Sequence, residues 1–267
     1  MNDNKKKLNE FIDILKWQVD IGADSMVEEK KNNLFLKKEK IDKNQTSEDF
    51  FSEVPGNILA NDLQTINKNN DQYLKELKNC STLEMLKDFI LKFDGCDLKK
   101  TATQIVFADG NPSSDIMFVG EAPGAEEDRQ GIPFCGASGQ LLDKMLASIN
   151  LDRKSVYITN VIPWRPPGNR TPTDNEIDLM KPFLMKHIEI VMPKILVAIG
   201  GSSAKAVLDI KGGILRHRGV WGELELDNGK KISTIPTLHP AYLMRAPNQK
   251  KLAWEDLKSI RSRLSLL

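Results

Sequence analysis

The stretch from Gly120 to Leu146 constrains the fold more than any other part of the chain, because it joins a strand-like run to a helix-like run through a long loop. Residues 116–119 are apolar and β-prone, whereas apolar residues from 141 to 149 repeat at helical spacing. The loop therefore lies at the carboxyl end of a strand, the edge where open α/β sheets bind ligands. It carries acidic residues, an aromatic residue and five glycines. Glycine also forms ordinary turns, so the loop alone leaves a purely structural role open.

A second strand-like run, 156–160, ends in the amide of Asn160 and continues into a loop rich in proline. Proline stiffens this loop, and its arginines, Arg165 and Arg170, can form charge-assisted hydrogen bonds to phosphate. A surface loop with two solvated arginines is the ordinary alternative. The loop is therefore a candidate contact for a phosphate backbone.

A third strand-like run, 232–238, ends in His239. Two apolar residues, Leu243 and Met244, follow shortly after it, and Arg245 comes next. Apolar side chains can enter a DNA base stack as wedges, and an arginine beside them can hold phosphate. As core and surface residues, the same side chains would look identical in the sequence.

Four motifs in one order carry a family resemblance: GEAPG with the following EED and PF, then TN, then RPPGNR, then HPAYLMR. They resemble the family 4 (type 4) enzymes of the uracil-DNA glycosylase superfamily, from about Phe93 to the C-terminus. The resemblance implies an enzyme that hydrolyses the N-glycosidic bond of uracil in DNA and starts base-excision repair. Two alternatives stay open: a glycosylase for another damaged base, and an inert DNA-binding or polymerase-associated module. The retained carboxylates, amide and imidazole argue against inertness.

The resemblance assigns catalysis to Glu121, Glu127 and His239. Bond cleavage leaves positive charge on the sugar and negative charge on the departing base. A carboxylate stabilises the sugar or orients water, and the two glutamates have near-equal standing. His239 donates a hydrogen bond to uracil O2 as negative charge accumulates there.

Uracil recognition is assigned to Phe134, Asn160 and Gly120. The base must leave the duplex or come from a single strand. Phe134 then stacks on the pyrimidine ring, although a core phenylalanine is the alternative. The Asn160 amide offers both a donor and an acceptor to uracil O4 and N3–H, whereas cytosine presents the opposite pattern.

The family carries an iron–sulfur cluster on four cysteines, and the chain departs from that pattern. Cys96 matches one ligand position, but the other three hold Phe93, Trp164 and Met180. These side chains cannot replace thiolates in a cubane site, so we expect no cofactor and a hydrophobic filling of the cluster volume. Rescue of the cluster by Cys80 or Cys135 is the alternative.

Strands that alternate with helices predict a three-layer α/β/α fold around a mostly parallel sheet of about four strands. We expect the glycosylase domain to span 81–267, and residues 1–80 to form an N-terminal helical or disordered extension. That extension combines an amphipathic helix at 8–19 with a polar linker over 28–79.

The composition narrows the class of protein further. A formal net charge of +1 argues against a uniformly basic nucleic-acid binder but allows a local basic groove. Three unevenly spaced cysteines favour a reducing compartment over a disulfide framework. Without a signal peptide or a long apolar run, we expect a cytoplasmic monomer that binds uracil-containing DNA and no membrane, with base-excision repair proteins as candidate partners.

Overall fold

The computed structural model describes residues 73–267 of the chain. The amphipathic helix expected at 8–19 lies outside the described residues, as does nearly all of the polar linker. The described part is helical over 73–79, and Leu77 and Cys80 from this region are buried.

A six-stranded sheet in the order β1-β3-β2-β4-β6-β5 forms the centre of the domain. The four inner strands, β3, β2, β4 and β6, run parallel, whereas β1 and β5 pair antiparallel at the two edges. The expected α/β class and parallel sheet are confirmed, and the two edge strands add to the expected number. The strands are β1 (Asp109–Gly110), β2 (Ile116–Gly120), β3 (Tyr157–Asn160), β4 (Ile195–Ile199), β5 (Gly222–Glu225) and β6 (Lys231–Thr237).

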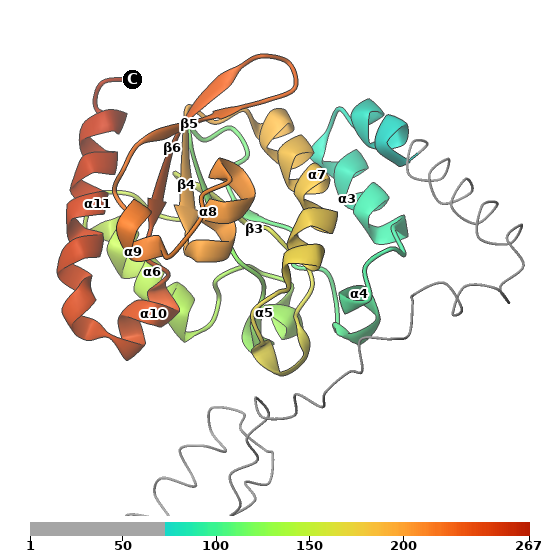
Figure 1. The fold of residues 1–267 in the computed structure, drawn as a ribbon, viewed down its shortest axis with the longest axis horizontal. Helices are drawn as coiled ribbons and strands as arrows, with labels where there is room; N and C mark the ends of the chain where they lie inside the picture. The colour runs from blue at the N-terminus through green and yellow to red at the C-terminus, as the bar shows by residue number, and fades with distance from the viewer. Residues whose placement is uncertain (1–72) are drawn as a thin grey trace, which may run out of the picture. The chain divides into compact units, whose positions relative to one another are not determined.

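Helices cover both faces of the sheet. Figure 1 shows α3 and α7 on one side and α6 and α11 on the other. The helices are α3 (Leu83–Lys92), α4 (Leu98–Thr101), α5 (Ala125–Gln130), α6 (Ala137–Ala147), α7 (Asp174–Val191), α8 (Gly201–Leu208), α9 (Ile214–His217), α10 (Pro240–Arg245) and α11 (Lys250–Leu264). The layered arrangement is the expected three-layer α/β/α fold.

Two buried cores, one on each face, explain the continuous apolar strands. In β2, Met117 and Val119 belong to the core under α3 and α7, whereas Ile116 and Phe118 belong to the core under α6 and α11. Successive side chains of a strand point to opposite faces, so a strand covered on both sides is apolar throughout. Burial of these runs holds the inner strands in register.

The register brings the ends of the parallel strands to one edge. Gly120 at the end of β2 lies opposite Asn160 at the end of β3. On the other side of β2, Ile199 of β4 lies opposite Thr237 of β6. The residues that follow each strand are therefore neighbours in space, although they are far apart in the sequence.

Candidate active site

A cavity of about 320 Å³ opens at the carboxyl ends of the parallel strands. It is lined by seven of the residues singled out in the sequence: Glu121, Glu127, Phe134, Asn160, Arg170, His239 and Arg245. A larger hollow of about 480 Å³ lies beside α7 and the β5–β6 connection and contains none of them. The cavity at the strand ends is therefore the candidate active site.

Gly120 is not in the cavity lining, but it lies between the Phe134 ring and the Asn160 amide, which both line it. A Cβ atom at Gly120 would lie 2.3 Å from Asn160 Oδ1 and 2.6 Å from the Phe134 ring. No other residue type fits between them, because real Cβ contacts are not that short. The strand end thus places a flat apolar surface and a polar amide on either side of one glycine.

The Asn160 side chain has an unused acceptor. Its Oδ1 atom is buried and has no hydrogen-bond partner among residues 73–267. A buried acceptor without a partner costs about 1–3 kcal/mol relative to a bonded one. A ligand that donates an N–H group to this atom recovers that free energy.

Phe134 adopts a left-handed backbone conformation with φ of 53°. This region is sterically unfavourable for a residue with a side chain, by roughly 1–2 kcal/mol. Its ring centroid lies 5.6 Å from that of His239, with 31° between the ring planes. The conformation directs a buried ring toward the cavity, where it can stack on a planar ligand.

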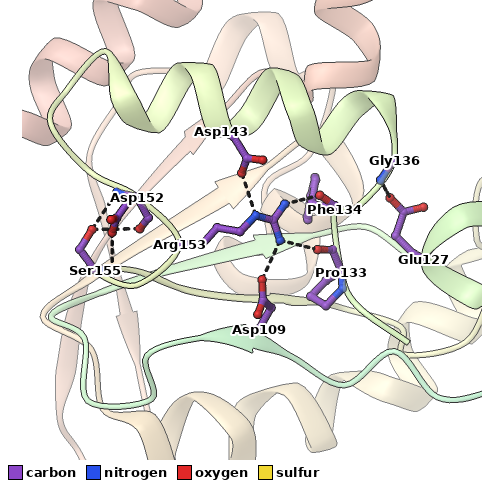
Figure 2. A network of polar contacts seen from close by, with 9 residues as sticks. All are labelled: Asp109, Glu127, Pro133, Phe134, Gly136, Asp143, Asp152, Arg153 and Ser155. Atoms are coloured by element: carbon purple, nitrogen blue, oxygen red, sulfur yellow. Dashed lines mark hydrogen bonds and ion pairs between the residues drawn. The ribbon is translucent and has the colours of Figure 1, made fainter. Parts of the chain in front are cut away.

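The two candidate carboxylates have different surroundings. Glu127 is buried, and its oxygens accept hydrogen bonds from the backbone N–H groups of Gly124 at 3.1 Å and Gly136 at 2.9 Å. These glycines precede α5 and α6, and Figure 2 shows the bond to Gly136. Glu121 accepts a 2.6 Å hydrogen bond from Ser202 on Oε2, and within residues 73–267 its Oε1 makes no hydrogen bond. Glu121 can therefore face a ligand or water, whereas Glu127 holds the loop together.

His239 caps α10 and is held in one tautomer. Its Nδ1 atom accepts a hydrogen bond from the backbone N–H of Ala241 at 3.1 Å. Burial and the nearby Arg245 guanidinium lower the pKa of His239 to about 4, against the raising effect of Glu127. The ring is therefore neutral at pH 7 with its proton on Nε2, ready to donate a hydrogen bond.

The basic loop after β3 is partly engaged within the protein. Arg170 forms a bidentate pair with Glu176 through distances of 2.9 and 2.7 Å. Arg165 donates to Asn169 Oδ1 at 2.7 Å and lies 4.0 Å from the carboxylate of Asp128. Both guanidinium groups keep N–H donors for a further anion, because each carries five.

The two candidate wedge residues of α10, Leu243 and Met244, differ in exposure. Leu243 is only 1% exposed and belongs to the core under α6 and α11, whereas Met244 is 48% exposed. A core residue cannot enter a base stack without unpacking the helix. We therefore revise the expectation for Leu243 and keep Met244 as the candidate wedge.

Three polar side chains at the candidate site were not singled out from the sequence. Ser138 and Asn169 line the cavity, and Ser202 binds Glu121 from the start of α8. Ser202 could have been found, since it follows β4 and every parallel strand delivers its next residues to this edge. Asp128 of α5 is also buried, and it accepts two hydrogen bonds from Thr103.

Cys135 follows Phe134 but is not arranged as a nucleophile. Burial, and then the negative charge of Glu127, raise the pKa of its thiol above the ordinary value. The thiolate, which is the reactive form, is thereby disfavoured. Cys135 remains a small residue beside the cavity loop.

The four positions that correspond to cluster ligands lie in one hydrophobic core. Phe93, Cys96, Trp164 and Met180 are all buried there. The Phe93 ring packs against Phe183 with centroids 4.8 Å apart. One thiol cannot supply the four thiolates of a cubane cluster. Among residues 73–267, no group of three or more His, Cys, Asp or Glu side chains is placed to hold a metal ion. The donor set does not fit an iron–sulfur cluster.

The chain is similar in sequence to known DNA-repair enzymes. The family model described as Uracil DNA glycosylase superfamily matches residues 107–258. The chain is 42% identical to the type-4 uracil-DNA glycosylase of Sulfurisphaera tokodaii over 67% of the chain and 84% of that protein. It is 40% identical to the type-4 uracil-DNA glycosylase of Archaeoglobus fulgidus over 67% of the chain and 92% of that protein. A DNA polymerase of Bacillus phage SP01 is 30% identical over 58% of the chain, but the match spans only 16% of the polymerase.

Proposed function

The chain belongs to the uracil-DNA glycosylase superfamily, and we propose that it removes uracil from DNA by hydrolysing the N-glycosidic bond, the step that starts base-excision repair. One observation carries the proposal: the Phe134 ring and the unpartnered Asn160 amide oxygen meet over Gly120 in a cavity that also holds Glu121 and His239. A planar base with an N–H donor can stack on this ring and donate a hydrogen bond to this amide oxygen.

Uracil is bound by stacking and by one amide. Because the glycosidic bond is hidden in the base stack, the nucleotide is extruded or comes from a single strand. Phe134 stacks on the ring, Asn160 Oδ1 accepts from uracil N3–H, and the Asn160 NH₂ group donates to O4. Cytosine has no proton on N3 and carries an amino group in place of O4, so both hydrogen bonds are lost.

A carboxylate on the sugar side of the bond and a neutral hydrogen-bond donor on the base side promote its cleavage. Glu121 offers its free Oε1 to the developing positive charge on the sugar or to the attacking water. Neutral His239 donates from Nε2 to uracil O2 as the base leaves. Glu127 supports the loop from which Phe134 projects, through the two backbone N–H groups it binds.

DNA is held around the cavity mouth. Arg165, Arg170 and Arg245 contact phosphate, which sets register without reading sequence. Met244 is exposed beside Arg245 and enters the stack at the position that the extruded base leaves.

The chain does not hold an iron–sulfur cluster. The absence of three ligand cysteines and the burial of Phe93, Trp164 and Met180 in a packed core support this. Dispersion and hydrophobic contacts among these side chains stabilise this part of the fold in place of a cluster.

The protein acts as a monomer in the cytoplasm, with other base-excision repair proteins as candidate partners. Its three cysteines are all unpaired, which suits a reducing compartment. Among the described residues, no helix is long and apolar enough to cross a membrane.

A base-release assay tests the proposed function. The full chain is incubated with single-stranded and duplex oligonucleotides that carry one uracil, hypoxanthine, mismatched thymine or cytosine. Release of uracil alone is expected, and Asn160→Asp should slow it. Faster release of hypoxanthine or thymine would favour the glycosylase for another damaged base. DNA binding without release of any base would favour the inert module.

A further inference from the structure

Arg153 lies outside the cavity but is bonded to the loop that carries Phe134. It is in the connection between α6 and β3. Its Nη1 atom donates to the Pro133 carbonyl at 3.1 Å, and its Nη2 atom donates to the Phe134 carbonyl. Its remaining bonds reach Asp143 of α6 at 2.8 Å and Asp109 of β1 at 2.7 Å. Figure 2 shows the guanidinium at the centre of these four partners.

The turn that presents Arg153 is itself closed by hydrogen bonds. Ser155 donates its backbone N–H to Asp152 Oδ1 at 2.9 Å, and Asp152 donates its backbone N–H to Ser155 Oγ at 2.8 Å. Such reciprocal side-chain bonds stabilise a turn locally. The guanidinium is therefore held by its backbone on one side and by Asp109 and Asp143 on the other.

The Phe134 carbonyl has little freedom to move. A Cβ atom placed on Gly139 would lie 1.5 Å from this oxygen, so the carbonyl sits directly against the first turn of α6. Phe134 also has a φ of 53°, a backbone conformation that persists only where its surroundings enforce it. Arg153 binds the two consecutive carbonyls at this point.

We infer that Arg153 is a positioning residue for the base: it fixes the backbone of Phe134 so that the ring is already a stacking platform when the base arrives. The inference rests on the proposed function. It separates Arg153 from the arginines proposed to contact phosphate, which are Arg170 and Arg245 in the cavity lining and Arg165 in the loop after β3. A recognition group that is already ordered in the free protein raises affinity, because no further conformational entropy is lost when the ligand binds.

The experiment compares two ligands with the full chain. One oligonucleotide carries 2′-fluoro-2′-deoxyuridine, which resists cleavage because fluorine disfavours positive charge on the sugar. The other has the same sequence with a tetrahydrofuran abasic analogue, which has no base to stack. In Arg153→Met we expect the Kd for the uracil oligonucleotide to rise about tenfold, while the Kd for the abasic one changes less than about twofold. Arg153→Lys should raise the Kd for the uracil oligonucleotide by less than Arg153→Met does. A lysine keeps the positive charge but lacks the planar guanidinium that binds two carbonyls at once.

A double-mutant cycle tests whether the effect runs through Phe134. If it does, adding Arg153→Met to Phe134→Ala should produce no further loss of uracil affinity. Arg263→Lys is the control, because Arg263 also has fold contacts, with Ser233 at 3.0 Å and over the Trp221 ring, but none with Phe134. It should leave the ratio of the two Kd values unchanged.

Equal losses for both oligonucleotides, or additive effects in the cycle, would show that Arg153 serves only general stability and would overturn the inference. If Arg153→Met does not fold, Asp143→Asn removes one anchor of the guanidinium and should give a smaller selective loss of uracil affinity. A wild-type protein with no preference for the uracil oligonucleotide would instead contradict the proposed function.

Discussion

The Ser202 hydroxyl donates a 2.6 Å hydrogen bond to Glu121 Oε2 and so ties the start of α8 to the loop after β2. The two residues are brought together because β2 and β4 are parallel neighbours that end at the same edge. The bond leaves Oε1 free and limits rotation of the carboxylate. Glu121 is thus oriented by a side chain, whereas both carboxylate oxygens of Glu127 accept hydrogen bonds from backbone N–H groups.

Ser202→Ala should slow uracil release without weakening DNA binding. Hydrogen bonds to charged groups contribute about 1.5–3 kcal/mol, so loss of this one should lower the single-turnover rate roughly tenfold or more. Ser203→Ala is the matched control, since the adjacent hydroxyl binds the Val119 carbonyl at 2.6 Å instead of a carboxylate. The control should lower the melting temperature and spare the rate. Equal rates for wild type and Ser202→Ala would remove Ser202 from the site.

Glu121→Gln and Glu127→Gln should fail in different ways. Loss of the Glu121 charge should lower the single-turnover rate on the order of 100-fold, with little change in thermal stability, because it acts on the transition state. Glu127→Gln keeps one acceptor but turns an NH₂ group toward a backbone N–H, so it should lower the free energy of unfolding by about 1–3 kcal/mol. Rates and thermal melts of the two variants, measured side by side, separate the roles. A stable but inactive Glu127→Gln would reverse the assignment.

His239 should act as a neutral donor over the whole working range of pH. Its pKa is lowered from 6.5 to about 4, so protonation begins only as the pH falls toward that value. The ratio of wild-type to His239→Ala rates should therefore stay constant between about pH 5.5 and 8. A cationic histidine with an ordinary pKa would make the ratio rise as the pH drops through about 6.5. Single-turnover rates across this range distinguish the two.

The sequence predicts the inner part of the fold because its signals are local. Apolar runs such as 116–119 and 195–199 mark strands buried on both faces, and the residues after them mark the site edge. The edge strands give no such signal: β1 has two residues, and β5 has a single buried side chain, Leu224. Their pairing depends on the neighbouring strand more than on their own sequence.

Side-chain roles within the site depend on contacts that the sequence does not contain. Leu243 and Met244 are adjacent and similar in chemistry, and only the packing of α10 decides which is buried. Glu121 and Glu127 likewise differ through their partners, a serine 81 residues away for one and two glycine N–H groups for the other. Arg153 acquires its four partners only when β1, α6 and the Phe134 loop come together.

The hydrophobic core at the positions of the cluster ligands should hold no metal. Protein purified without oxygen should be colourless and contain far less than one iron per chain. Cys96→Ser and its matched control Cys80→Ser, both at buried free cysteines, should each leave uracil release nearly intact, because neither thiol has a metal to bind. Trp164→Ala should lower the free energy of unfolding by roughly 3–5 kcal/mol, since the indole is 2% exposed and its removal leaves a cavity. About four irons per chain with broad visible absorption, lost in Cys96→Ser, would overturn the prediction and require three further ligands from elsewhere in the chain.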